Sequence, residues 1–145
     1  MNEIAPKKRI RLRQFLINHA GATPDLDFEG IMSDILPDEP WELVAVMCTV
    51  NTKVGSGVVT YVALGKNVHA AEGTVVVDGL AKKPGIILHY EPAVDQAAAT
   101  AQMRTMFFPF PEPIHFDESD KLNIYSRNSG AQITTFVVTI HYRVL

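Results

Sequence analysis

Two histidine–carboxylate pairs are the residues of this chain whose types and spacing come nearest to metal chemistry. His89 precedes Glu91 by two positions, and His115 precedes Asp117 by two, so each pair lies on one face of an extended strand. Imidazole and carboxylate side chains together bind iron, manganese or zinc, as in a cupin-like enzyme. Strand alternation often produces such pairs, however, and the chain has no His-x-His motif. The sequence therefore predicts no metal and no other cofactor.

Nucleophilic side chains lack the sequence context that catalysis requires. Ser56 and Ser126 do not lie in a nucleophile elbow, and the scattered glycines never form a phosphate-binding loop with its lysine and hydroxyl. Cys48 is the single cysteine, so no intrachain disulfide is possible, and its alternating apolar surroundings predict a buried structural thiol. We therefore expect a protein that is not an enzyme.

Charge is divided unevenly along the 145 residues. Residues 1–13 contain five bases and one acid, a net charge of +4, whereas the remainder contains eight bases and fifteen acids, a net charge of −7. Such a basic arm favours an acidic partner, and nucleic acid is the weaker alternative because no aromatic residues are interleaved with the bases. Ile10 and Leu12 alternate with arginines, which also fits a strand in the protein's own sheet. The predicted partner-binding bases are Lys7, Lys8, Arg9, Arg11 and Arg13.

Alternation of apolar and polar residues predicts the fold class. Residues 122–125 and 135–144 alternate on either side of a turn at 128–130, which predicts a terminal hairpin, and residues 44–51 and 58–64 predict a second one. Shorter strands are expected at 74–78, 86–90, 103–108 and 114–116. Seven or eight short strands predict an all-β antiparallel sandwich, with a jelly roll as the first choice.

One helix is predicted before the sandwich. Thr23 is a suitable cap, Pro24 suits the first helical position, and apolar residues recur at helical spacing as far as Leu36. We therefore divide the chain into an extended basic arm with a short docking helix, residues 1–40, and a β-sandwich domain, residues 41–145.

A proline repeat interrupts the later part of the sandwich. Pro109, Pro111 and Pro113 recur at every second position, so their missing N–H donors fall on one edge of a strand. The pattern predicts an edge strand protected against further pairing, or a segment laid over a partner. On the second interpretation Phe108 and Phe110 are the partner-binding aromatic residues.

Two strands are apolar on both faces, and this indicates self-association. Val75–Val77 and Ile86–Leu88 leave little polar surface on either side, although a two-layer sandwich buries only one face of each sheet. Exposed apolar patches commonly mark association sites. A homo-oligomer is therefore expected, with a trimer favoured.

The sequence contains no apolar stretch long enough to span a bilayer, and its N-terminus lacks the apolar run of a signal peptide. We expect synthesis in the cytoplasm and no membrane partner.

The layout is similar to that of small jelly-roll-like virion proteins, especially bacteriophage capsid decoration or cement proteins. The resemblance covers nearly the whole chain, including the strand-like segments Asp120–Tyr125 and Thr139–Arg143, and it includes no diagnostic motif. It implies a non-enzymatic protein, often trimeric, made in the host cytoplasm and placed on the surface of an icosahedral capsid. The implied partner is the major capsid protein, which the arm would reach over.

Two alternatives come from other classes of function. A carbohydrate-binding or receptor-binding β-sandwich would need exposed aromatic side chains, and the candidates are Trp41, Tyr61, Tyr90 and Tyr125. A cupin-like enzyme would need a bound metal.

Overall fold

A computed structural model describes residues 8–20, 23–28, 36, 38–52, 60–67, 86–92, 102–128 and 133–145, with the backbone alone at 19–20, 23–28 and 133. The strand expected at 74–78 and the turn residues between 53 and 59 lie outside these ranges.

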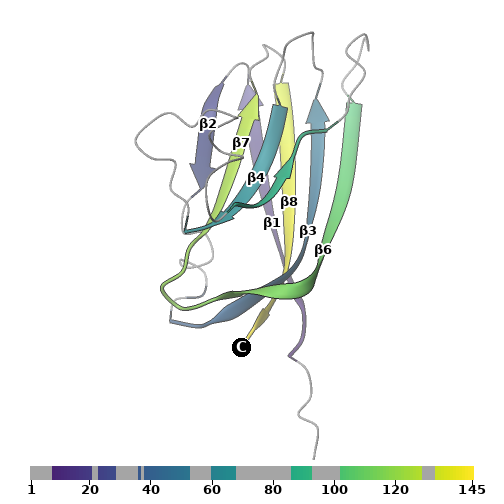
Figure 1. Ribbon diagram of the computed structural model, residues 1–145. Coiled ribbons are helices and arrows are strands. Elements are labelled where there is room, and N and C mark those ends of the chain that lie inside the picture. Colours follow the sequence, from purple (N-terminus) through teal and green to yellow (C-terminus); the bar gives the residue numbers. More distant parts are fainter. Residues whose placement is uncertain are drawn as a thin grey trace, which may run out of the picture.

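The described residues form two four-stranded antiparallel sheets packed as layers (Figure 1). Sheet A has the order β1-β8-β3-β6 and sheet B the order β2-β7-β4-β5. The strands are β1 (Arg11–Ala20), β2 (Thr23–Phe28), β3 (Trp41–Thr52), β4 (Thr60–Lys66), β5 (Ile86–Tyr90), β6 (Gln102–Phe116), β7 (Leu122–Asn128) and β8 (Ile133–Val144). Except between β4 and β5, each successive strand lies in the opposite sheet, which is the strand order of an eight-stranded jelly roll. The predicted fold class is confirmed.

The two predicted hairpins are wrong, although their strands are present. β7 lies in sheet B between β2 and β4, while β8 lies in sheet A between β1 and β3. β3 and β4 are likewise in different sheets. Alternation specifies which face of a strand is buried, but it does not specify the neighbouring strand. The strands of each predicted hairpin therefore lie in layers about 10 Å apart instead of side by side in one sheet.

The predicted helix is also wrong where the structure describes it. Residues 23–28 form strand β2, which pairs with β7 from Thr23↔Asn128 to Phe28↔Ile124, and the described residues contain no helix. The register shifts between Thr23 and Leu26, where Pro24 lacks an N–H donor. A helical pattern this short nucleates poorly, and pairing with β7 supplies the backbone partners instead. Residues 29–35 of the predicted helix lie outside the described ranges.

Strand β1 places the last residues of the basic arm, from Arg11 onward, in the sandwich. It pairs with β8 in ten consecutive registered pairs, from Arg11↔Tyr142 to Ala20↔Ile133. Ile17 is buried in the core, and Phe15 packs against the core. The first sheet thus begins at Arg11, and the division at residue 40 stays a prediction about which part of the chain folds alone.

The core is apolar and closes around aromatic side chains. Trp41 stacks on Phe116, with ring centroids 4.1 Å apart, and Tyr142 meets Trp41 edge-on at 6.0 Å. Cys48 is fully buried in the same core, and burial raises the pKa of its thiol to about 12. The predicted buried structural thiol is confirmed.

Strand β6 is the second edge of sheet A, and it carries the proline repeat. Leu43 pairs with Ile114 and Ala45 with Pro109, so residues 110–113 of β6 bulge opposite the single residue Val44. Two of the bulged residues are prolines, which cannot donate to a ladder, and the ribbon of β6 bends in its last part (Figure 1). The predicted edge strand is confirmed.

Deleting residues 1–20 is expected to destabilise the whole sandwich, because the deletion removes β1 and leaves β8 with an unpaired edge. The lost burial of Ile17 alone corresponds to about 2–3 kcal/mol, so the free energy of unfolding should fall by at least that amount. Chemical denaturation measures it, and deletion of residues 1–7 is the control, with little expected change. An unchanged midpoint after the longer deletion would show that residues 41–145 fold without the arm.

A matched pair of point variants tests the same pairing without truncation. Ile17 is 4% exposed and Leu16 is 65% exposed, on opposite faces of β1. Ile17→Ala should cost about 2–4 kcal/mol, whereas Leu16→Ala in dilute solution should cost less than about 0.5 kcal/mol. Equal costs would contradict the placement of β1.

Candidate partner-binding surfaces

The described bases of the arm gather at one end of the β1 edge. Lys8, Arg9 and Arg11 line a polar pocket of about 300 Å³ together with Glu39, Val144 and Leu145. Arg13 is also exposed, and its guanidinium carbon lies 6.0 Å from the ring centroid of Phe15. Lys7 lies outside the described residues. The described cations predicted to bind a partner therefore lie along one short stretch at the start of β1.

The exposure of these arginines follows from the position of β1. Arg11 and Arg13 share the core-facing side of the strand with Phe15 and Ile17, because alternate residues point the same way. Only Ile17 is buried, so burial along this side falls off toward the start of the strand. A strand that begins beyond the packed layers keeps its cations in water and leaves them available to a partner.

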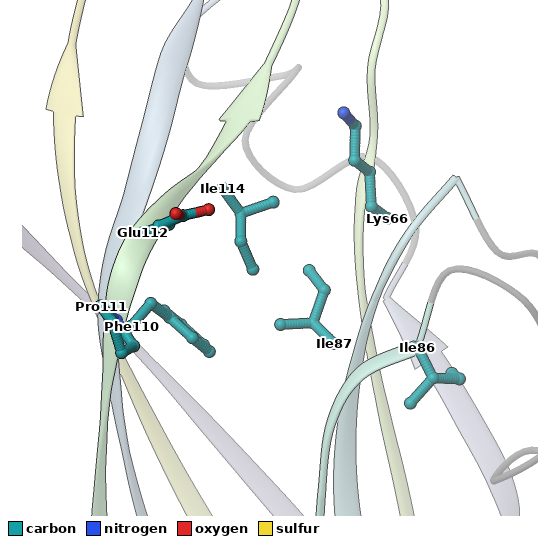
Figure 2. A pocket seen from close by; sticks show the side chains of 7 residues that line it. All are labelled: Lys66, Ile86, Ile87, Phe110, Pro111, Glu112 and Ile114. Carbon is teal, nitrogen blue, oxygen red and sulfur yellow. The ribbon is translucent and has the colours of Figure 1, made fainter.

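An apolar groove lies between the edge strands of the two sheets. It has a volume of about 540 Å³, within the range of small-molecule pockets. Ile87 of β5 and Phe110 and Ile114 of β6 point into it, as Figure 2 shows. The remaining lining residues are Lys66, Ile86, Pro111 and Glu112.

The two phenylalanines predicted to bind a partner have different surroundings. Phe108 is half-buried and meets the ring of Tyr90 edge-on at 5.6 Å, and burial is the main cause of a raised pKa for that tyrosine. Phe110 is half-buried and lines the groove. Both lie at the β6 edge of sheet A, whereas the arm bases lie at the β1 edge. The structure therefore does not bring the predicted bases and aromatics together.

A polar cluster holds one end of the groove in place. Lys66 donates a hydrogen bond to the carbonyl of His115 at 2.7 Å, and its Nζ lies 3.3 Å from a carboxylate oxygen of Asp120. Asn67 donates to the other carboxylate oxygen at 2.7 Å, from a backbone with φ of 55°. The N–H of Asp117 donates to Asp120 as well, at 2.7 Å. The cluster therefore ties the end of β4 to the connection between β6 and β7.

These donors stabilise the charged form of the Asp120 carboxyl. Burial by itself raises the pKa of its carboxyl, but the hydrogen bonds from Asn67, Asp117 and Lys66 and the charge of Lys66 outweigh it. The net pKa is lower than the ordinary value of 3.8. Sequence reasoning missed this cluster, because its members are far apart in the chain and no motif connects them.

The candidate metal pairs lie in separate places. His115 shares a 2.6 Å hydrogen bond with Asp117, and His89 packs against the ring of Tyr61 at 4.8 Å. Within the described ranges, no group of three or more histidine, cysteine, aspartate or glutamate side chains is placed to hold a metal ion.

The aromatic candidates for a carbohydrate platform are mostly in the core. Trp41, Tyr61 and Tyr125 are at most 1% exposed, and Tyr90 is half-buried against Phe108. A stacking platform needs an exposed ring face, which these three buried residues do not offer.

The part of the chain that the structure describes contains no helix that is long and apolar enough to cross a membrane.

Comparison with known proteins gives weak similarities only. No protein-family model and no curated protein sequence matches the chain. A structure of turnip yellow mosaic virus is similar at 16% identity with a TM-score of 0.39, over 99% of this chain and 86% of the viral chain. A Kashmir bee virus empty particle is similar at 11% identity with a TM-score of 0.36, over 99% of this chain and 96% of the viral chain. A Bacillus endospore appendage, described as a disulfide-linked pilus, is similar at 14% identity with a TM-score of 0.34, over 100% of this chain and 98% of the appendage chain. The fold assignment rests on the strand pairing above.

Replacing Asp120 with Asn should destabilise the protein in a pH-dependent way. A group whose pKa is lowered by folding contributes stability above its ordinary pKa and loses that contribution as the pH falls through its folded pKa. Asp120→Asn should therefore lower the free energy of unfolding by about 1 kcal/mol at neutral pH, through lost charge-assisted hydrogen bonds. Denaturation curves should show this difference shrinking below pH 3.8.

The control for this prediction is Asp117→Asn. The Asp117 side chain is 68% exposed and shares its 2.6 Å hydrogen bond with His115, itself an exposed side chain, so a small effect is expected at every pH. Equal losses for the two variants at neutral pH would contradict the role given to Asp120.

Proposed function

We propose that this chain is a non-enzymatic structural protein of a virion, which decorates or cements an icosahedral capsid by binding the major capsid protein. The observation that supports it most is the cationic end of β1, where Lys8, Arg9, Arg11 and Arg13 are exposed on a chain whose residues 14–145 have a net charge of −7. Exposed cations at a sheet edge attract an acidic protein surface and orient the body against it.

The jelly-roll fold is used by capsid proteins, by lectins and by cupins, so the fold alone does not select among them. The lectin alternative lacks support because three of its four aromatic candidates are buried. The cupin alternative lacks support among the described residues, where the two histidine–carboxylate pairs are not joined by a third ligand. Binding to a capsid requires exposed surfaces that fit a partner and no catalytic site. The chain has a charged surface at the start of β1 and an apolar groove beside β6.

The proposed contact uses both edges of sheet A. The arm bases, Lys7 included, bind carboxylates of the capsid subunit, and Phe110 at the groove, with Phe108 behind it, supplies apolar contact. Arginine suits this role because its planar guanidinium pairs with a carboxylate through two hydrogen bonds. The protein then sits on the capsid surface as an oligomer, with a trimer favoured, after synthesis in the host cytoplasm. Nucleic acid remains the weaker alternative partner for the arm.

Reversing charges in the arm is expected to weaken attachment to the capsid. Arg11→Glu with Arg13→Glu should lower the affinity for shells at least about tenfold, and added salt should weaken the unmodified protein in the same direction, because exposed charges are screened within about 10 Å. Co-sedimentation with shells that lack the chain measures the bound fraction. The control is Lys121→Glu with Arg127→Glu, two bases beside and within β7 of sheet B. An equal loss from both double variants, or no loss from the first, would contradict the proposal.

The metal alternative is tested directly by elemental analysis. The purified protein should carry no stoichiometric iron, manganese or zinc, and His89→Ala and His115→Ala should leave capsid binding unchanged. About one metal ion per chain, lost in either variant, would favour a cupin-like enzyme instead.

A further inference from the structure

The outer face of sheet A, on the side away from the core, carries no charged side chain over four registered rows. The strand pairings place β1, β8, β3 and β6 side by side, and the core residues Val46, Cys48 and Val138 occupy the opposite face. The outer rows are Leu12-His141-Ala45-Pro109, Gln14-Thr139-Met47-Phe107, Leu16-Val137-Thr49-Thr105 and Asn18-Thr135-Asn51-Met103. We call these sixteen positions the neutral face.

The absence of charge distinguishes the neutral face from an ordinary solvent-exposed surface. Two of the sixteen positions, Ala45 and Thr139, are themselves buried. Charged residues make up about 25–35% of ordinary surfaces, so about four of the other fourteen positions would normally carry Asp, Glu, Lys or Arg. On the outer face, charges first appear beyond one end of the four rows, where Arg143 pairs with Glu42 at 2.9 Å. Large apolar side chains are exposed in both outer strands instead, with Leu12 at 62%, Leu16 at 65%, Met103 at 66% and Phe107 at 50%.

Polar groups of the neutral face bind one another across the strands. Gln14 donates to Thr139 at 3.4 Å, Thr135 donates to Asn18 at 2.9 Å, and the hydroxyls of Thr49 and Thr105 are 3.0 Å apart. The ring of Phe107 also contacts that of His141, with centroids 5.6 Å apart. Because these donors and acceptors already have partners within the sheet, covering the face costs less than burying unpaired polar groups.

We propose that the neutral face binds the neutral face of a second copy of this chain, in a two-fold, sheet-on-sheet contact. A charged partner gains nothing from a face without charge and must bury its own charges unpaired. A second copy brings the same uncharged surface with the same internal hydrogen bonds. Two sheets of the same twist also stack well, with the sheets about 10 Å apart and their strand directions at an angle of about 30°.

The size of the face fits a reversible association. Four strands and seven residues span about 19 Å by about 20 Å, so stacking two copies covers roughly 800 Å² in total. Standard specific interfaces bury about 1,200–2,000 Å² and obligate dimers about 2,000 Å² or more, so this contact belongs to the weak, transient class. The contact is therefore expected to form at micromolar concentrations and to dissociate on dilution. It does not depend on the proposed capsid role.

The test compares two neighbouring residues of β6 that are similarly exposed on opposite faces. Phe107, on the neutral face, is 50% exposed, and Met106, on the other face, is 46% exposed. Sedimentation equilibrium of the full chain from about 1 to 300 µM should show a reversible rise in mass. Phe107→Lys should weaken this association at least tenfold, because a two-fold contact buries the new charge twice, whereas Met106→Lys should leave it unchanged. Thermal melting verifies that both variants fold.

A second variant and the observed masses complete the test. Leu16→Lys, at the other edge of the neutral face, should weaken the association as Phe107→Lys does. A monomeric mass throughout the concentration range overturns the proposal, and so does an equal effect of Phe107→Lys and Met106→Lys. A trimer insensitive to Phe107→Lys also overturns it while leaving the capsid proposal intact. A hexamer that Phe107→Lys converts to trimers supports it.

Discussion

The pairing of β8 with both β1 and β3 is the interaction on which the rest of the structure depends. β8 comes from the end of the described chain, and it lies between a strand that begins at Arg11 and one that begins at Trp41. Its residues Phe136, Val138 and Ile140 are fully buried, so the core of sheet A is completed only when these distant segments meet. Such long-range pairing costs loop-closure entropy before burial repays it, which makes slow, cooperative folding the expected behaviour.

The same pairing determines what the two edges of sheet A can do. β1 becomes one edge, and its first residues carry the exposed arginines. β6 becomes the other edge, and its prolines and bulge create one wall of the apolar groove while limiting further strand addition. The neutral face lies between these edges. One strand order thus separates a cationic surface, a flat uncharged surface and an apolar groove on a small protein.

The sequence allowed the strands to be predicted better than their neighbours. Alternation located β3 and β8 because the core-facing side of each is the more deeply buried one, and it located β7 although that strand is buried on both faces. It could not show that β7 and β8 belong to different sheets, since a strand of either sheet buries alternate residues. The predicted helix failed at β2 because pairing with β7 overrode a short local preference. The groove was not predictable, because it depends on how the bulge at 110–113 lies against Ile87 of β5. The proline repeat was nevertheless a correct signal for an edge strand.

The central claim is that this jelly roll attaches to a capsid through the β1 edge, and electron cryo-microscopy of the particle that contains the chain tests it most directly. The claim predicts density for the eight-stranded sandwich at regular positions on the shell surface, with the arginines of β1 against an acidic region of the major capsid protein. Absence of the chain from purified particles, or attachment through sheet B with the β1 edge facing solvent, would contradict it.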